Sequence, residues 1–195
     1  FENDPVIRVP EIELGVSTGR LLTMSWLDGR PLLSHKQDSL EDRNRIAQAM
    51  FRAWWYPFSH HGVIHGDPHL GNYTVFIEDG RPAGLNLLDY GCIRTFPVAL
   101  VQGVIDLYKG LLANDQPRIV HAYERWGFKG LTSDLIEAMT MWARFIYGPL
   151  LDDRERTIAE DTKPGEYGRR EAFAVHKILK EKGPVTVPRE FVFMD

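Results

Sequence analysis

The sequence His65-Gly66-Asp67-Pro68-His69-Leu70-Gly71-Asn72, followed by Asp89-Tyr90-Gly91, is the most informative part of this 195-residue chain. Asp67 and Asn72 are five positions apart, and Asp89 comes seventeen positions after Asn72. Each element is common by itself, because Asp-Pro opens many turns and a lone histidine is usually a packing or surface residue. Their occurrence together, in this order, indicates a site that handles metal ions and protons.

The residues between Asn72 and Asp89 predict a short β-hairpin. Two apolar stretches, residues 73–77 and 84–88, flank the turn sequence Glu78-Asp79-Gly80. Apolar runs of strand length on either side of Asp-Gly are typical of two antiparallel strands joined by a tight turn. Such a hairpin would hold Asn72 and Asp89 at a fixed spacing, which matters because a small misplacement costs much of a reaction rate.

These residue types suit phosphoryl transfer, a reaction in which the protein supplies mainly position and charge. Mg²⁺ is a hard cation that takes oxygen ligands, so the Asp89 carboxylate and the Asn72 amide oxygen are candidate metal ligands. Asp67 would orient or deprotonate the attacking hydroxyl or water. The predicted catalytic residues are therefore Asp67, Asn72 and Asp89, with Asn72 and Asp89 as the metal ligands.

The two motifs resemble those of kinases. The Asp-to-Asn spacing is that of the catalytic loop H-R-D-x-x-x-x-N, and Asp89-Tyr90-Gly91 stands where kinases have D-F-G. Residues 65–72 most closely resemble H-A-D-P-H-P-G-N, the loop of the UbiB family of atypical kinases, also called aarF-domain-containing kinases. Gly66 and Leu70 depart from that pattern.

The resemblance extends over most of the chain. Residues 20–29 are similar to the strand and hinge of the family, and residues 187–192 are similar to its P-P-E-F-V segment. The likeness is strongest over residues 20–29 and 62–91 and weakest over 114–183. It implies that an extended hinge holds the adenine through its backbone, with Asp28 near the ribose. The expected nucleotide-binding residues are Met24, Ser25, Trp26, Leu27 and Asp28.

The family resemblance implies an α+β fold, mostly helical. Residues 1–28 would be the end of an N-terminal lobe with its hinge, and residues 29–195 a protein-kinase-like C-terminal lobe with a short β-hairpin carrying the catalytic loop. The sequence contains no G-x-G-x-x-G, V-A-I-K or K-x-G-Q element and no alanine-rich nucleotide loop. We therefore expect a fragment of a longer kinase that is inactive alone, because phosphate-gripping elements are needed for efficient transfer.

By the same resemblance, the intact protein is expected to be an atypical kinase or ATPase that uses ATP and Mg²⁺ and supports ubiquinone biosynthesis. Its partners would be ATP and a lipid-like isoprenoid quinone precursor or membrane-associated biosynthetic proteins. Its expected location is cytoplasmic with peripheral membrane association. No A-P-E follows Asp89-Tyr90-Gly91, which argues against a protein-substrate platform of the ordinary kinase type.

Two other functions remain open from the sequence. Aminoglycoside and choline phosphotransferases carry H-G-D-x-H-x-G-N, which Gly66 matches better, but they continue with a G-D-P-x-x-D-L stretch that this chain lacks. A nucleotide-binding pseudokinase scaffold is the other alternative, and the intact metal ligands argue against it.

Composition limits the remaining classes. The chain is 44% hydrophobic and 26% charged, which is ordinary for a folded domain. Its net charge of −4 gives no basic footprint for nucleic acid, so we expect no nucleic-acid partner. A single cysteine, Cys92, excludes an internal disulfide and a cysteine-based zinc site. No apolar run reaches transmembrane length.

Outside the motifs, periodicity and turn signals predict the remaining elements. Strands are expected at residues 6–14 and 20–26, and a helix capped near Ser39 should reach about His60, with Pro57 causing a kink or an early end. Further helices are expected over residues 98–113, 116–126, 133–147 and 166–181.

Overall fold

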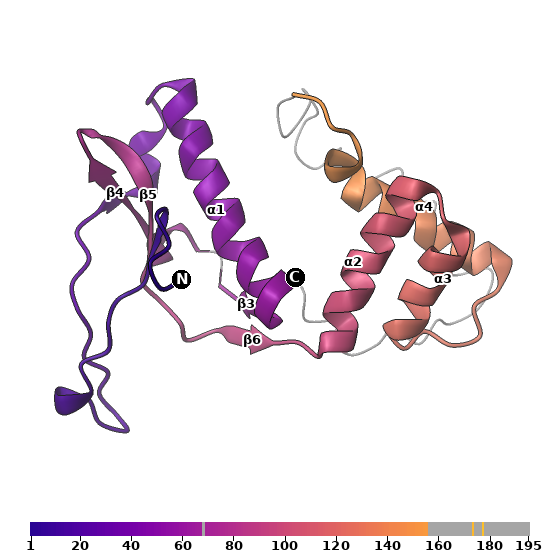
Figure 1. Cartoon of the computed structure of the whole chain (residues 1–195), viewed down its shortest axis with the longest axis horizontal. Helices are drawn as coiled ribbons and strands as arrows, with labels where there is room; N and C mark the ends of the chain where they lie inside the picture. The colour runs from indigo at the N-terminus through magenta and orange to yellow at the C-terminus, as the bar shows by residue number, and fades with distance from the viewer. Residues whose placement is uncertain (68, 156–172, 174–176, 178–195) are drawn as a thin grey trace. The chain divides into compact units, whose positions relative to one another are not determined.

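The computed structural model describes residues 1–67, 69–155, 173 and 177. The chain forms two compact units, residues 1–95 and 96–195 (Figure 1). The boundary expected between residues 28 and 29 falls inside the first unit, so the division into kinase lobes stays a prediction. The described part of the chain mixes helices with small sheets.

The first unit is organised around a four-stranded sheet with the order β1-β5-β4-β2. Its strands are β1 (Ile7–Arg8), β2 (Arg30–Pro31), β4 (Tyr73–Glu78) and β5 (Arg81–Leu87). β4 and β5 pair antiparallel where the sequence predicts a hairpin. Asp79 and Gly80 form the tip with φ of 49° and 78°, the left-handed conformations that a tight two-residue hairpin turn requires.

Helix α1 (Leu40–His61) covers one face of this hairpin. Tyr73, Val75, Leu85 and Leu87 alternate along the two strands and pack with Ile46, Ala49 and Ala53 of α1. Val75 and Leu85 are fully buried, and burying such a side chain contributes about 1.5–3 kcal/mol. The opposite face of the hairpin is thereby left to carry Thr74 and Asn86, because side chains alternate between faces along a strand.

The ends of α1 follow from local sequence signals. The Ser39 hydroxyl accepts a hydrogen bond from the Asp42 N–H at 3.1 Å and caps the helix start. The helix ends at Gly62, which adopts a left-handed φ of 65°. Pro57 lies inside the helix and does not end it, so of the two effects expected of this proline, the early end does not occur.

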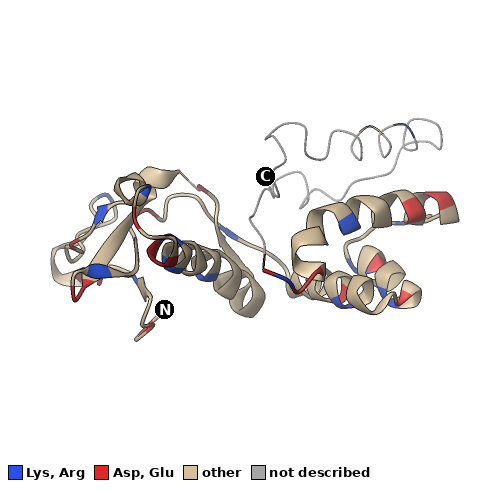
Figure 2. Cartoon of the chain, turned by 90° about the horizontal axis from the view of Figure 1, so that it is seen from above, with Lys and Arg blue, Asp and Glu red and all other residues tan. Residues whose placement is uncertain are grey.

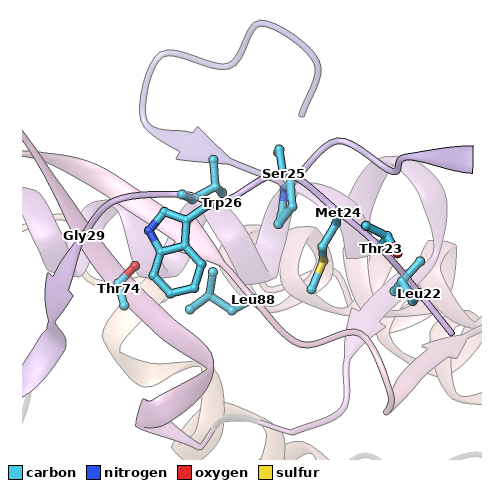
Figure 3. Close-up of a pocket in the computed structure, with 10 residues that line it drawn as sticks. Leu22, Thr23, Met24, Ser25, Trp26, Gly29, Thr74 and Leu88 are labelled. Carbon is cyan, nitrogen blue, oxygen red and sulfur yellow. The ribbon is translucent and has the colours of Figure 1, made fainter. Parts of the chain in front are cut away.

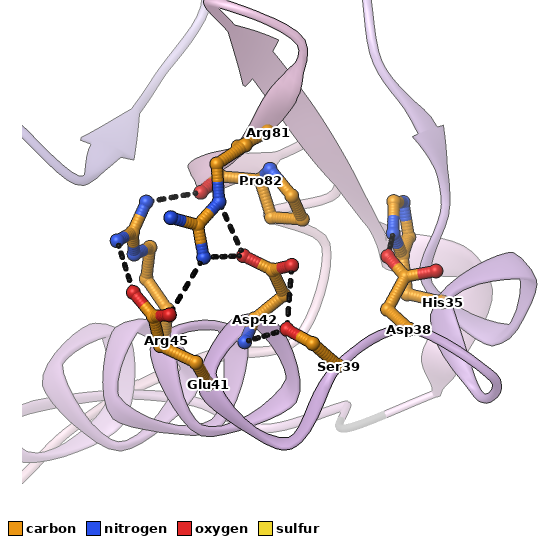
Figure 4. Close-up of polar contacts among 8 residues, drawn as sticks. All are labelled: His35, Asp38, Ser39, Glu41, Asp42, Arg45, Arg81 and Pro82. Atoms are coloured by element: carbon orange, nitrogen blue, oxygen red, sulfur yellow. Dashed lines mark hydrogen bonds and ion pairs between the residues drawn. The ribbon is translucent and has the colours of Figure 1, made fainter.

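A charged cluster joins the start of α1 to the tip of the hairpin (Figure 4). The Arg81 guanidinium donates to Asp42 Oδ1 at 2.8 Å and lies 3.0 Å from Glu41 Oε2. The Ser39 hydroxyl donates to the second Asp42 oxygen at 2.7 Å. These contacts, led by the Ser39 hydrogen bond, keep the pKa of Asp42 below its ordinary value.

The expectation of two strands at residues 6–14 and 20–26 is wrong for most of that length. Only β1 forms a strand, and the two segments meet each other at the isolated bridge Ile12↔Met24, while Leu21 bridges Thr18 in the turn between them. A short 3-10 helix, η1 (Leu14–Val16), begins at the last residue of the first segment, and Pro10 has no N–H to donate to a ladder. Between β1 and β2 the chain forms a long arm that leaves the sheet and returns to it (Figure 1).

The second unit contains α2 (Val98–Ala113), α3 (Gln116–Arg125) and α4 (Ser133–Leu151) among its described residues. The helices expected at 98–113, 116–126 and 133–147 are confirmed, although α4 runs four residues further. Their packed interior consists of Leu107, Leu111, Ile119, Ala122, Tyr123 and Ala143. The helix expected at 166–181 and the segment 187–192 lie outside the described residues, except for positions 173 and 177.

Charges of both signs are interspersed along the chain (Figure 2). Arg118 of α3, for example, pairs with Asp106 of α2 at 2.9 Å. Among the residues that the structure describes, no helix combines the length and the apolar character needed to cross a bilayer.

Candidate functional site

Two nested strand pairs bring the two predicted catalytic motifs together. β3 (Val63–His65) pairs antiparallel with β6 (Ile93–Thr95), and β4 pairs antiparallel with β5. The loop at 66–72 runs from β3 to β4, and the loop at 88–92 runs from β5 to β6. Both loops run between the same two ladders: each starts or ends at the β3–β6 pair and has its other end at the β4–β5 pair. The two loops therefore lie side by side.

The first loop holds Asp67 against Asn72, the last residue of the 3-10 helix η3 (Leu70–Asn72). The Asn72 side-chain nitrogen donates to Asp67 Oδ2 at 3.0 Å, and the His69 backbone N–H donates to Asp67 Oδ1 at 3.1 Å. These bonds, with that from Asn72 the stronger, keep the pKa of Asp67 below its ordinary value of 3.8. Asp67 is therefore a carboxylate at neutral pH.

The second loop starts beside Asn72. The Leu88 N–H donates to the Asn72 carbonyl at 3.0 Å, and Asp89 follows directly. Asp89 Oδ1 accepts a hydrogen bond from the Gly91 N–H at 2.7 Å, which shapes the turn of the D-Y-G motif. Because the Asn72 amide nitrogen is bound to Asp67, the amide oxygen is the side-chain atom of Asn72 that could bind a metal.

The predicted donor set fits a magnesium ion chemically, with one amide oxygen from Asn72 and one carboxylate from Asp89, and with phosphates and water to complete the shell. Among the described residues, no group of three or more His, Cys, Asp or Glu side chains could hold a metal ion. A metal at Asn72 and Asp89 would therefore depend on the nucleotide for further ligands.

His65 links the two loops and was not assigned a role from the sequence. Its Nδ1 accepts a hydrogen bond from the Asp67 N–H at 3.3 Å, and its Nε2 contacts the Asp89 carbonyl. With Nδ1 as acceptor, Nε2 carries the ring proton and donates a hydrogen bond to the Asp89 carbonyl. The signal that could have identified it is its position two residues before Asp67, where kinases have the histidine of H-R-D.

The ring of Tyr90 anchors the second loop to the hydrophobic core. It packs against the cluster formed by α1 and the hairpin, and its hydroxyl donates to the Leu87 carbonyl at 2.6 Å. Burial raises the pKa of Tyr90 to about 12, so this residue stays neutral and acts as a fixed support for Asp89.

A cavity of about 440 Å³ lies beside the loops (Figure 3), a volume in the range of small-molecule sites. Met24, Ser25, Trp26 and Leu27, four of the predicted nucleotide-binding residues, line it. The other lining residues are Pro10, Leu22, Thr23, Gly29, Thr74 and Leu88. Thr74 lies two positions after Asn72, and Leu88 immediately precedes Asp89.

The backbone of the cavity wall at residues 24–27 is not helical, and Met24 forms an isolated antiparallel bridge with Ile12. The Glu13 N–H donates to the Thr23 carbonyl at 2.9 Å, and the Ser25 N–H donates to the Glu11 carbonyl at 2.8 Å. Met24 lies between these bonds, so its own N–H and carbonyl point to the opposite edge, as alternate residues of an antiparallel pair do. They are suitable groups to bond the edge of a base.

Asp28, expected near a ribose, is not among the residues that line the cavity. Its carboxylate accepts a hydrogen bond from the Trp26 indole N–H at 3.0 Å, and its carbonyl accepts one from Asn86. The ribose contact therefore stays a prediction, while the structure gives Asp28 a part in fixing the shape of the segment.

Comparison with known families agrees with this geometry. Residues 1–123 match the sequence profile of the ABC1 atypical kinase-like domain. The chain belongs to this family. It is the group of atypical kinases that the catalytic motifs indicate, and the match argues against the aminoglycoside and choline phosphotransferase alternative.

Relatives include the Arabidopsis thaliana protein ACTIVITY OF BC1 COMPLEX KINASE 1, chloroplastic, which is 26% identical over 69% of this chain and 20% of its own length. The atypical kinase COQ8, mitochondrial, of Saccharomyces cerevisiae is 26% identical over 49% of this chain and 19% of its own length. The chain thus spans about a fifth of the length of these relatives.

A solved structure has a similar fold. It is the complex of Rv3197 with erythromycin from Mycobacterium tuberculosis, with a TM-score of 0.52 and 20% identity, and the match covers 92% of this chain and 49% of the other. At this level of identity the likeness concerns the fold alone.

Proposed function

We propose that this chain carries the Mg²⁺–ATP site of a UbiB-type atypical kinase or ATPase that supports isoprenoid quinone biosynthesis. The observation that carries the proposal is the composition of one cavity. Its wall contains the predicted hinge residues Met24 to Leu27 together with Thr74 and Leu88, the near neighbours of Asn72 and Asp89. An adenine pocket and a metal site must adjoin in this way if one nucleotide is to occupy both.

The adenine end is supported by shape and by backbone polarity. Trp26, Met24 and Leu88 present apolar side chains to one space (Figure 3), and apolar walls with a few directed polar groups are usual in cofactor sites. The outward N–H and carbonyl of Met24 would bond the base, and Leu88 would cover its face.

The phosphate end is supported by the donor set. Asn72 and Asp89 would hold Mg²⁺, which when bound neutralises the charge that develops on the phosphates. Asp67 is ionised and fixed by Asn72 and His69. It would orient the attacking hydroxyl or water by accepting a hydrogen bond from its O–H group.

The role of Asp67 follows from its lowered pKa. A carboxylate that is less basic than usual is a poor acceptor for a full proton before the reaction begins. In a loose transition state little proton transfer is needed early. We infer that Asp67 mainly positions the acceptor and takes the proton late.

Binding of partial ligands tests the proposal. The ¹⁵N-labelled chain is titrated with adenosine, with ATP and with Mg²⁺–ATP, and amide shifts are followed by NMR, which detects weak binding. Asp89→Asn should retain adenosine binding and lose the gain in ATP affinity that Mg²⁺ provides. Asp79→Asn is the matched control, since it makes the same chemical change at the turn tip, where asparagine is well tolerated. An equal Mg²⁺ effect in all three proteins would refute the metal assignment.

A further inference from the structure

Asn86 is a fully buried polar residue in β5 whose side chain reaches across the sheet. It is 0% exposed. Its amide nitrogen donates to the Asp28 carbonyl at 3.0 Å and to the Thr74 hydroxyl at 2.9 Å. One side chain therefore joins the end of the segment that lines the cavity to both strands of the hairpin.

The positions of these residues in the sheet give the contact its meaning. Asn86 and Thr74 are directly opposite in the β4–β5 ladder, and Thr74 is also opposite Pro31 of β2. Asn86 lies three positions before Asp89, and Thr74 lies two positions after Asn72. Asn86, which bonds Asp28, and Thr74, which bonds Asn86, thus belong to the two strands that adjoin the predicted metal ligands.

Gly29 allows the close approach. A Cβ atom built on Gly29 would lie 2.4 Å from the Thr74 hydroxyl oxygen and 2.7 Å from the Asn86 amide nitrogen. Its φ is not in the left-handed region, so the requirement for glycine comes from space and not from backbone conformation. Any larger residue would push residues 24–29 away from the hairpin.

The chemistry of Asn86 indicates that its donor group is what matters. Its Oδ1 is buried and has no hydrogen-bond partner among the described residues, which opposes stability. An apolar residue would avoid this cost in a strand whose neighbours Leu85 and Leu87 are already buried. The two bonds made by its amide nitrogen are the feature that such a residue could not supply.

We propose that Asn86 is a positioning residue that clamps residues 24–29 to the β4–β5 hairpin and so sets the distance between the adenine and metal ends of the site. The identity of the ligand in this inference rests on the proposed function. The clamp itself rests on the hydrogen bonds of Asn86 in the structure. A nucleotide that occupies both ends gains from their fixed separation, because its second contact forms at a high effective concentration. A ligand that occupies one end gains nothing from it.

The proposal predicts a specific pattern of affinities. Asn86→Leu removes the donor and keeps a branched side chain of similar shape, and Asn86→Ala is the second variant in case leucine does not fit. Adenosine affinity should change by less than about twofold, whereas Mg²⁺–ATP affinity should fall about tenfold or more. Gly29→Ala should also lower Mg²⁺–ATP affinity more than adenosine affinity, because its Cβ would collide with Thr74 and Asn86. Leu85→Val, a buried change on the opposite face of β5, is the control for general destabilisation and should lower neither affinity selectively.

Hydrogen exchange of the ligand-free chain tests the clamp without any nucleotide. In both Asn86 variants, peptides covering residues 23–31 should exchange faster than in the wild type, while peptides from α1 should not. Leu85→Val should not show this selective change. Unchanged exchange of residues 23–31 in a folded Asn86 variant would overturn the clamp, whatever the protein binds.

The two proposals fail in different ways. If the wild type binds neither adenosine nor Mg²⁺–ATP while exchange responds as expected, the proposed function fails and the positioning role in nucleotide binding fails with it. If the wild type binds both and the Asn86 variants lose adenosine and Mg²⁺–ATP affinity equally, the function stands. In that case Asn86 serves only stability and the positioning role is wrong.

Discussion

The side-chain nitrogen of Asn72 donates a hydrogen bond to Asp67 Oδ2 at 3.0 Å. This contact connects the predicted catalytic carboxylate to a predicted metal ligand. It orients the Asn72 amide oxygen away from Asp67 and lowers the pKa of that carboxylate. One hydrogen bond thereby prepares both residues for the separate roles that we assign to them.

Replacing Asp67 by asparagine should retain the fold and nucleotide binding, because an amide oxygen still accepts the hydrogen bond from Asn72. Turnover of the intact protein should fall, by about 10²- to 10⁴-fold if Asp67 contributes as general bases usually do, and by less if it mainly orients the acceptor. Steady-state ATP hydrolysis with and without Mg²⁺ measures this. Unchanged hydrolysis in Asp67→Asn would leave only a scaffolding role for the motif.

Acid should weaken the first unit through Asp42. Its pKa in the folded chain lies below the ordinary value of 3.8, chiefly because Ser39 donates to it and then because Arg81 pairs with it. A lowered folded-state pKa gives stability that is complete well above the ordinary value of 3.8 and is lost as pH falls from there through the folded pKa. Urea unfolding at pH 7, 4 and 3 measures the free energy of unfolding. Between pH 7 and pH 3 this free energy should fall less in Asp42→Asn than in the wild type. Asp79→Asn, at the exposed turn, should lose as much stability as the wild type. An equal fall in unfolding free energy with pH in all three proteins would contradict the role that we give to Asp42.

Gly103 of α2 should not tolerate alanine, although alanine normally favours a helix. A Cβ atom there would lie 2.4 Å from the Trp126 indole nitrogen, which donates to the Leu100 carbonyl at 3.0 Å. Overpacking of this kind typically costs about 1–3 kcal/mol. Thermal unfolding of Gly103→Ala should therefore show a lower midpoint. In a Trp126→Phe background, Gly103→Ala should cost less stability than in the wild type. If the effects of the two substitutions simply add in the double variant, the steric cause is contradicted.

The segment with Leu21, Leu22 and Trp26 should promote association of the isolated chain. Their exposed fractions are 58%, 57% and 87%, and a partly paired extended segment offers backbone groups to another molecule. Sedimentation of the wild type should show concentration-dependent association that Leu21→Ser with Leu22→Ser reduces. The paired control Leu112→Ser changes an exposed leucine of α2 and should leave association unchanged. A wild type that stays monomeric at high concentration would contradict the prediction.

The sequence predicted the β4–β5 hairpin and the helices α1 to α4 well because their signals are local. Asp79-Gly80 determines a turn, and Ser39 determines a helix start, without reference to distant residues. The strands expected at residues 6–14 and 20–26 failed because a strand needs a partner along its length. Residues 7–8 find one in β5, whereas the two segments meet each other only at the isolated bridge Ile12↔Met24.

The site was predicted in part for the same reason. Asp67, Asn72 and Asp89 stand at characteristic spacings, so the motif selects them as candidates, and their roles stay predictions. In the sequence Asn86 is one position of an apolar strand, since its bond to Asp28 spans 58 residues and depends on a ladder pairing with Thr74 that the sequence does not display. His65 opens the motif, but its link to Asp89 forms only when the two loops are side by side.

Paramagnetic broadening by Mn²⁺–ATP tests the central claim most directly, because it locates the metal and the base in one experiment. We expect weak binding by this chain, which lacks a K-x-G-Q element. Mn²⁺–ATP should broaden the amide resonances of Asn72 and Gly91 and the Asn72 side-chain amide first, while metal-free adenosine shifts those of Met24 to Leu27. Asp89→Asn should abolish the broadening and preserve the adenosine shifts. Broadening centred on other carboxylates, such as Asp106 of α2, with residues 72 and 91 unaffected, would contradict the account.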